Sequence, residues 1–326
     1  MAKRPSRTAG AAPVSWRDGV HLTGTPIWCD ARRKRDICFV SSLDGRPAGA
    51  QLIGTPATLA LLAAKGSGHL AVPVRQRFTL GTVRLQLIPS GRGLGAAALH
   101  ADIAGRTVMY AAAVRTFAGG LGDAAEVRSC DALVVDAPYG EPHHVFPPLE
   151  KVIDEVHTWT RAELAGARRP VLFADSVLDA LEIACSLAAH GIPVSSSKNV
   201  RDAAARASTL APLPGHAAEA IARVGKEPRA VVWLDNDHAG LRKAIGTYRF
   251  STALASGRAI AVRDSGAGYD AVFAWACSAD RAQLLAWIDA TGARSVFITG
   301  SCADAIAATL GPRARVLGPP QQMALF

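Results

Sequence analysis

The sequence contains no run of 18 apolar residues, and its first residues lack the apolar core of a signal peptide. We therefore expect neither a membrane-spanning segment nor a membrane partner. It also contains no C-x-x-C pair, because its six cysteines are scattered: Cys29, Cys38, Cys130, Cys185, Cys277 and Cys302. This scatter argues against a zinc ribbon and a disulfide scaffold, and it favours a reducing, cytoplasmic location.

Charged residues are scarce, at 19% of the 326 residues, whereas hydrophobic residues reach 49%. This balance excludes a mainly disordered chain and allows one large domain or two ordinary ones. The charges are also unequal, with a net charge of +9. A basic balance favours nucleic acid or another polyanion as a partner. The densest cluster is the block Arg32, Arg33, Lys34 and Arg35, and residues 1–14 are expected to form a basic flexible arm.

Runs of small and β-branched apolar residues that end in turn chemistry predict buried strands at 37–41, 83–89, 99–103, 107–113, 132–136, 168–174, 191–195, 230–234 and 295–299. Residues 15–30 are expected to form two short strands around Gly24. Helical spacing predicts helices at 56–65, 149–164, 177–189 and 281–291, the first capped by Thr55. Such an alternation of strands and helices predicts an α/β fold.

Three short motifs lie in the middle of this pattern: GRGLGAA at 91–97, AAAVR at 111–115 and DAPYG at 136–140. They resemble motifs of the metallo-β-lactamase nucleases of the β-CASP group, and most closely the ligase-associated exonucleases of bacterial DNA repair. In that family the motifs read roughly GHxLGSA, SGDYK and ESTYG. Further pieces match in order and with fitting spacing, so that the resemblance covers residues 15 to about 312.

The resemblance implies an αββα metallo-β-lactamase sandwich with an inserted β-CASP domain. It divides the chain into the arm at 1–14, the first part of the sandwich at 15–168, the insertion at 169–255, the second part of the sandwich at 256–316 and a tail at 317–326. Active relatives hold two metal ions, which activate water and neutralise phosphate.

The metal-binding residues of the family are missing here. Where the family has histidine or a bridging aspartate, this sequence has Val40, Ser42, Gly45, Arg92, Ala113, Asp280 and Gly300. Two acids remain at family positions, Asp44 and Asp136, and we expect them to be turn and strand-end residues that bind backbone groups. The resemblance therefore predicts a catalytically inactive protein without a metal cofactor.

Such a protein could still bind nucleic acid without cutting it. We expect the sandwich and the insertion to form a basic cleft that binds DNA, with RNA as an alternative. The candidate contacts are Arg32, Arg33, Lys34, Arg35, Arg46 and Arg92. The predicted role is that of a binding or scaffold subunit in DNA repair or replication, together with other repair proteins.

A rival hypothesis depends on the sequence Asp235-Asn236-Asp237 after a predicted strand. Its spacing resembles the magnesium motif of Toprim domains, for which Asp175 could supply the upstream acid. Paired carboxylates at a strand end can hold Mg²⁺. The alternative is a polar turn in which Asp or Asn caps the following helix.

Two further features need an interpretation. His143 and His144 could suggest a metal pair, but adjacent side chains point in different directions, so we expect surface-loop histidines. The last residues follow Pro319 and Pro320 and resemble the peptide with which bacterial repair proteins dock on the sliding clamp. The contacts expected for that docking come from Gln322, Met323, Leu325 and Phe326.

Overall fold

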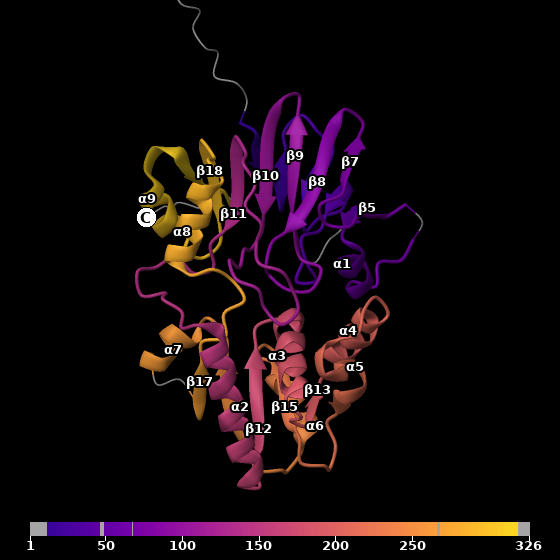
Figure 1. Cartoon of the computed structure of the whole chain (residues 1–326), viewed down its shortest axis with the longest axis vertical. Helices are drawn as coiled ribbons and strands as arrows, with labels where there is room; N and C mark the ends of the chain where they lie inside the picture. The colour runs from indigo at the N-terminus through magenta and orange to yellow at the C-terminus, as the bar shows by residue number, and fades with distance from the viewer. Residues whose placement is uncertain (1–11, 46–48, 67, 266–267, 319–326) are drawn as a thin grey trace, which may run out of the picture.

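Three β-sheets form two units, one above the other in Figure 1. This computed structural model describes residues 12–45, 49–66, 68–265 and 268–318. The upper unit holds two sheets. The first contains, in order, β1 (Val14–Trp16), β2 (Val20–Leu22), β3 (Ile27–Cys29), β4 (Arg35–Phe39), β5 (Gly49–Gly54) and β6 (Leu70–Ala71). The second has the order β19 (Ala314–Val316), β18 (Ser295–Thr299), β11 (Ala132–Asp136), β10 (Arg106–Ala111), β9 (Ala97–Ile103), β8 (Val83–Pro89) and β7 (Arg77–Leu80).

These two sheets pack face to face. Phe39 and Ile53 of the first sheet meet Leu87 and Leu99 of the second in one buried cluster. Alternate residues of each strand point to the opposite face, where helices cover them. Helix α1 (Pro56–Leu61) covers the first sheet, and helices α8 (Arg281–Ala290) and α9 (Ala303–Leu310) cover the second. The layers therefore run helix, sheet, sheet, helix.

The lower unit contains the third sheet, whose strands are all parallel. Its order is β14 (Ala222–Arg223), β13 (Val194–Ser196), β15 (Ala230–Leu234), β12 (Arg169–Ala174), β16 (Phe250–Ala255) and β17 (Ala271–Phe273). One face is covered by α2 (Leu149–Ala165), α3 (Val177–Ala189), α4 (Lys198–Ser208) and α5 (Ala217–Ala220). The other face is covered by α6 (His238–Ile245) and α7 (Ala259–Ser265). Burial on both faces explains why β12 and β15 are continuous apolar runs.

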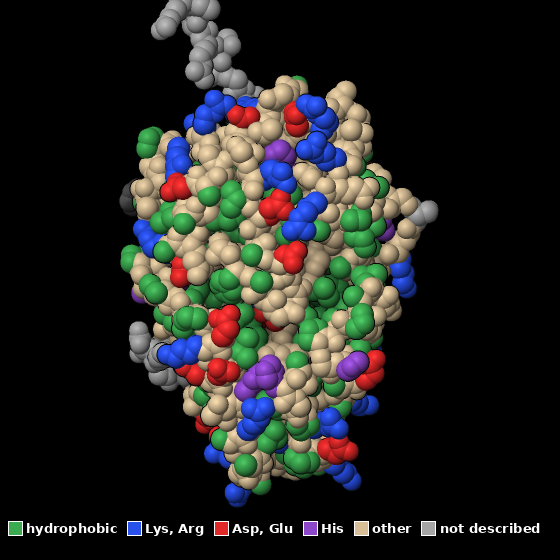
Figure 2. Space-filling view, in the orientation of Figure 1, with side chains coloured by type: hydrophobic (Ala, Val, Ile, Leu, Met, Phe, Trp, Pro, Cys, Tyr) green, Lys and Arg blue, Asp and Glu red, His purple; other side chains and the backbone are tan. Residues whose placement is uncertain are grey.

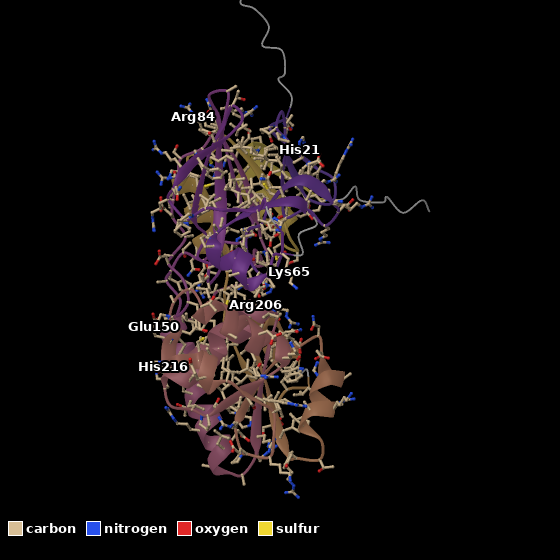
Figure 3. All side chains as sticks on the ribbon, turned by 90° about the vertical axis from the view of Figure 1, so that its right-hand side faces the viewer. His21, Lys65, Arg84, Glu150, Arg206 and His216 are labelled. Atoms are coloured by element: carbon tan, nitrogen blue, oxygen red, sulfur yellow. The ribbon has the colours of Figure 1, made fainter. Side chains whose placement is uncertain are left out.

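The two units are joined by buried and partly buried polar contacts. Arg115 of the upper unit makes a bidentate ion pair with Glu182 of α3, at 2.8 and 3.1 Å, and neither side chain is more than 3% exposed. Arg206 of α4 donates to the carbonyl oxygen of Leu61 at the end of α1. Figure 3 shows Arg206 close to the junction, next to the segment that carries Lys65. The junction is thus a packed interface between two units of one chain.

The structure confirms the α/β architecture and the predicted strands, with small differences at their ends. Residues 15–30 contain three short strands instead of the predicted two, because the chain turns at Gly19 as well as at Gly24. A Cβ at Gly19 would lie 2.6 Å from the Cα of Ala31, so only glycine fits. Helix α1 is shorter than predicted and ends at Leu61. Within the described residues, no helix is long and apolar enough to cross a membrane.

Candidate functional site

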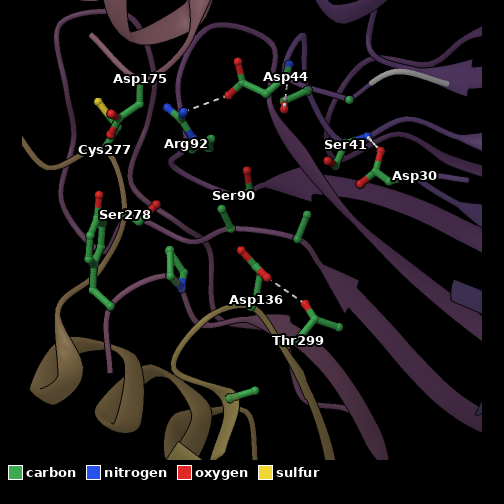
Figure 4. Close-up of a pocket in the computed structure, with 18 of the residues that line it drawn as sticks. Asp30, Ser41, Asp44, Ser90, Arg92, Asp136, Asp175, Cys277, Ser278 and Thr299 are labelled. Carbon is green, nitrogen blue, oxygen red and sulfur yellow. Dashed lines mark hydrogen bonds and ion pairs between the residues drawn. The ribbon is translucent and has the colours of Figure 1, made fainter. Parts of the chain in front are cut away.

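A cleft of about 1520 Å³ opens where the two units meet (Figure 4). The upper unit lines it with the segments that follow β4, β8, β10, β11 and β18, and the lower unit with those that follow β12 and β16. Seven positions that the sequence assigned to the family's site line it together: Ser42, Asp44, Gly45, Arg92, Ala113, Asp136 and Gly300. Val40 is instead buried against α1, and Asp280 caps α8.

Arg92 occupies one side of this cleft, where three side chains of the protein contact its guanidinium. Its guanidinium lies 2.7 Å from a carboxylate oxygen of Asp44 and makes hydrogen bonds of 2.5 and 3.0 Å with the carboxylate of Asp179. It also donates to the hydroxyl of Ser176, and only 14% of the side chain is exposed. Burial alone would raise the pKa of Asp179, but the Arg92 charge and hydrogen bonds outweigh it and lower that pKa. Arg92 thus links the β8–β9 loop to α3.

Two other acids lie on the opposite side of the cleft. Asp30 accepts hydrogen bonds from the backbone N–H of Ser41 (2.9 Å) and the hydroxyl of Tyr110 (2.8 Å). Asp136 accepts one from the hydroxyl of Thr299 at 2.7 Å, a side-chain partner where a backbone partner was predicted. Burial raises the pKa of both carboxyl groups, although the hydrogen bonds act against it. Asp30 was not predicted as a site residue, although its position directly after the opening strands was an available signal.

The donor set does not fit the metal pair of the resembled family. At position 300 the backbone has a φ of +96°, and a Cβ would lie 2.7 Å from a carboxylate oxygen of Asp136. A Cβ at Gly45 would lie 3.2 Å from a carboxylate oxygen of Asp30. The space for two of the missing histidines is therefore restricted. Among the described residues, no three His, Cys, Asp or Glu side chains gather in a way that could hold a metal ion.

The described cleft is acidic, which contradicts the predicted basic cleft. Its charged lining residues are Asp18, Asp30, Asp44, Asp136, Asp175, Asp179, Asp304, Arg32 and Arg92. The prediction failed because it added up arginines along the sequence, whereas the fold turns aspartates from many segments towards one space. Arg46 lies outside the described residues.

The basic block lies at the rim of the cleft. Arg32, Arg33 and Lys34 are exposed in the turn between β3 and β4, and Arg32 lines the cleft. Arg33 pairs with Asp18 at 2.9 Å, with 76% of its side chain exposed. Arg35 differs, because it donates to the carbonyl oxygen of Arg17 and stacks on Trp28. Over the face shown in Figure 2, basic and acidic side chains are interspersed.

The three acids of the rival magnesium hypothesis do not converge. Asp175 and Asp235 follow the neighbouring parallel strands β12 and β15, and Arg258 bridges them at 2.5 and 2.8 Å. Tyr269 donates to Asp235 as well. Asp237 turns away: it caps α6 by accepting from the N–H of Gly240, as the turn interpretation predicted. A guanidinium therefore lies where a cation would have to bind.

His143 is exposed as predicted, but the prediction of a surface position is wrong for His144. His144 is 8% exposed, and its Nδ1 accepts from the N–H groups of Gly140 and Glu141 at 3.2 and 3.1 Å. Burial lowers the pKa of this ring and favours the neutral form that these bonds need. Its role is to hold the loop after β11.

No protein-family model matches this chain. Over 191 residues, 56% of the chain, it is 26% identical to a protein of Opitutus terrae described as a probable DNA ligase. The chain spans 18% of the length of that protein.

Proposed function

We propose that this protein is a catalytically inactive relative of the β-CASP exonucleases that binds nucleic acid as a scaffold subunit in DNA repair or replication. One observation carries the proposal: seven positions of the resembled metal motifs line a single cleft, yet an arginine paired with two aspartates occupies it. The layers helix, sheet, sheet, helix, with a parallel unit beside them, are compatible with the family's fold.

The proposed division of the chain keeps 15–168 and 256–316 for the sandwich and 169–255 for the insertion. The third sheet begins at β12, residue 169, but helix α2 (Leu149–Ala165), which covers this sheet, precedes the proposed start. Its last strand, β17, lies at Ala271–Phe273, so the sheet continues past the proposed return at 256.

The loss of catalysis follows from the chemistry of the cleft. Hydrolysis of a phosphodiester by the family needs metal ions that lower the pKa of water and neutralise charge on the phosphate. Valine, glycine and alanine cannot coordinate an ion, and Arg92 adds a fixed charge that Asp44 and Asp179 already balance. The two acids left at family positions, Asp44 and Asp136, are engaged by Arg92 and Thr299.

Nucleic-acid binding is proposed at the rim and not in the depth of the cleft. The net charge of +9, the exposed Arg32, Arg33 and Lys34, and the DNA-related relative support it. Arg35 is left out because it is half-buried and stacks on Trp28, and Arg92 because two aspartates already pair with its charge. DNA is the proposed partner, RNA the alternative, and the cytoplasm the proposed location.

The absence of metal-dependent cleavage is the first testable prediction. We expect elemental analysis of the protein purified from zinc- and manganese-supplemented medium to show no tightly bound metal pair, and expect no cleavage of single- or double-stranded DNA or RNA with Mn²⁺, Zn²⁺ or Mg²⁺. The matched control is Asp44→Ala, which should leave any background cleavage unchanged. About two bound metals per chain, or cleavage that disappears in Asp44→Ala, would overturn the proposal of inactivity.

The scaffold role includes docking on the bacterial sliding clamp through the tail, whose residues 319–326 lie outside the described residues. Titration of the clamp should give micromolar affinity, roughly −8 kcal/mol, because a short peptide buries little area. Replacing Leu325 and Phe326 with alanine should cost at least about 2 kcal/mol, whereas Gln321→Ala should bind unchanged. Equal binding by a chain without residues 322–326, or none by either, would end the docking hypothesis.

A further inference from the structure

A second cavity, of about 580 Å³, opens in the lower unit at the carboxyl edge of the third sheet. Ser196 and Arg223 at the ends of β13 and β14 line it, together with Trp233 of β15. Lys198 of α4 and Lys243 of α6 complete the basic part of the lining. The cavity is distinct from the cleft between the units, since the two have no lining residue in common.

The topology of the sheet explains why a cavity forms at this place. After β13 the chain enters α4, whose buried residues pack on one face of the sheet. After β15 it enters α6, which packs on the opposite face. Because the chain leaves two neighbouring parallel strands in opposite directions, a crevice opens between their carboxyl ends. Open α/β sheets bind ligands at such points.

The positive charge of the cavity lining favours an anionic ligand. Four cationic side chains, Lys198, Arg201, Arg223 and Lys243, face one carboxylate, Asp202, which leaves a net charge of +3. Asp202 pairs with Lys198 at 2.5 Å. In the part of the chain that the structure describes, Arg223 and Lys243 form no ion pair, so their donors remain available for an anion.

Two further features of the lining suit a phosphate carried on a nucleoside. The cavity includes Ser197 and Lys198 at the start of α4, an 11-residue helix whose first N–H groups and dipole favour negative charge. Its other wall is apolar and consists of Val224 and Trp233, the latter held by a hydrogen bond from its indole N–H to Asp237. The volume lies within the range of small-molecule sites.

We propose that this cavity binds the phosphate of a nucleotide-sized ligand, with Arg223 and Lys243 as the main anion contacts. The shared chemistry is a phosphate monoester or polyphosphate on a nucleoside, which either a free nucleotide or the 5′ end of an oligonucleotide can supply. This site is separate from the rim proposed to bind nucleic acid, so either proposal can fail alone.

Calorimetric titration of the full chain with ATP, AMP, inorganic phosphate and a dinucleotide with or without a 5′ phosphate tests the proposal. We expect saturable binding that needs the phosphate and is at least about tenfold weaker in Arg223→Gln/Lys243→Gln. The matched control is Arg242→Gln, an exposed cation next to Lys243 that does not line the cavity and should bind as the wild type does. If ATP binds more tightly than the phosphorylated dinucleotide, the ligand of the cavity is a free nucleotide. If the phosphorylated dinucleotide binds more tightly, the ligand is the 5′ end of a nucleic acid.

Three outcomes would overturn the proposal. They are no saturable binding of any of these probes at millimolar concentration, equal binding of the dinucleotide with and without phosphate, and equal weakening by Arg242→Gln. Circular dichroism of each variant shows that a loss of binding is not a loss of folding. Substitution of Arg32, Arg33 and Lys34 should leave this binding unchanged, which separates the cavity from the rim.

Discussion

Replacing Arg115 with leucine is expected to lower the free energy of unfolding by about 3–5 kcal/mol. Arg115 is fully buried and pairs with Glu182, which is 3% exposed. Burial alone would lower the pKa of the guanidinium, but Glu182 raises it above its usual value, so that the guanidinium is charged. Leucine would leave an unpaired carboxylate in the junction of the two units, where water cannot solvate it. Urea denaturation measures the loss.

Two controls make this expectation specific to burial. Arg84 pairs with Asp102 at 2.6 Å, but 73% of the Arg84 side chain is exposed, so Arg84→Leu should cost no more than about 1 kcal/mol. The double variant Arg115→Leu/Glu182→Leu should be more stable than Arg115→Leu, because no buried charge is left unpaired. A cost for Arg115→Leu no larger than that for Arg84→Leu would contradict the structural role assigned to the pair.

Substituting glutamine for Arg32, Arg33 and Lys34 is expected to weaken nucleic-acid binding at least about tenfold at low salt. Each phosphate contact releases counterions, so the loss of three contacts should make the slope of log affinity against log salt shallower by about 2 to 3. Fluorescence anisotropy with labelled single- and double-stranded oligonucleotides across a salt series measures both quantities.

The control variant removes the same number of positive charges from a surface away from the rim. Arg77, Arg84 and Arg106 are exposed on the second sheet, and none of them lines the cleft. The triple glutamine variant at these positions should retain most of the affinity. Equal losses in the two triple variants would show that net charge alone drives binding and would refute the rim as the interface. An absence of binding by the wild type at low salt would refute the nucleic-acid role altogether.

Local information in the sequence determined many of the strands and helices of this protein. Continuous apolar runs such as those of β12 and β15 can be buried only on both faces of a sheet, which indicates parallel strands between helices. Thr55 before Pro56 marked the start of α1, and Asp237 was recognised as a possible cap of α6; both side chains cap their helices. Motif spacing was also informative, because the segments that resemble the metal motifs do line one cleft.

Some strands and helices were not predicted because their local sequence signals are weak. Strand β5, with the sequence GAQLIG, begins and ends in glycine, which has a poor strand propensity. Helix α4 buries mostly alanines, so its sequence has few large apolar residues to show a helical period. Strand β5 forms because it pairs with β4 and packs against α1, and helix α4 forms because it packs against α3.

Only the tertiary structure decided the charge and chemistry of the cleft. Arg92 and Asp179 are 87 residues apart, and Arg115 and Glu182 are 67 residues apart, so no local spacing reveals that these side chains meet. Arg258 likewise pairs with Asp175 and Asp235, which follow strands much earlier in the chain. An arginine attracts phosphate only while its charge is unmatched, and whether a carboxylate matches it depends on which distant segments the fold brings within about 4 Å. Motif spacing therefore indicated several of the segments that surround the cleft, and long-range pairing decided which charges are left over to bind a partner.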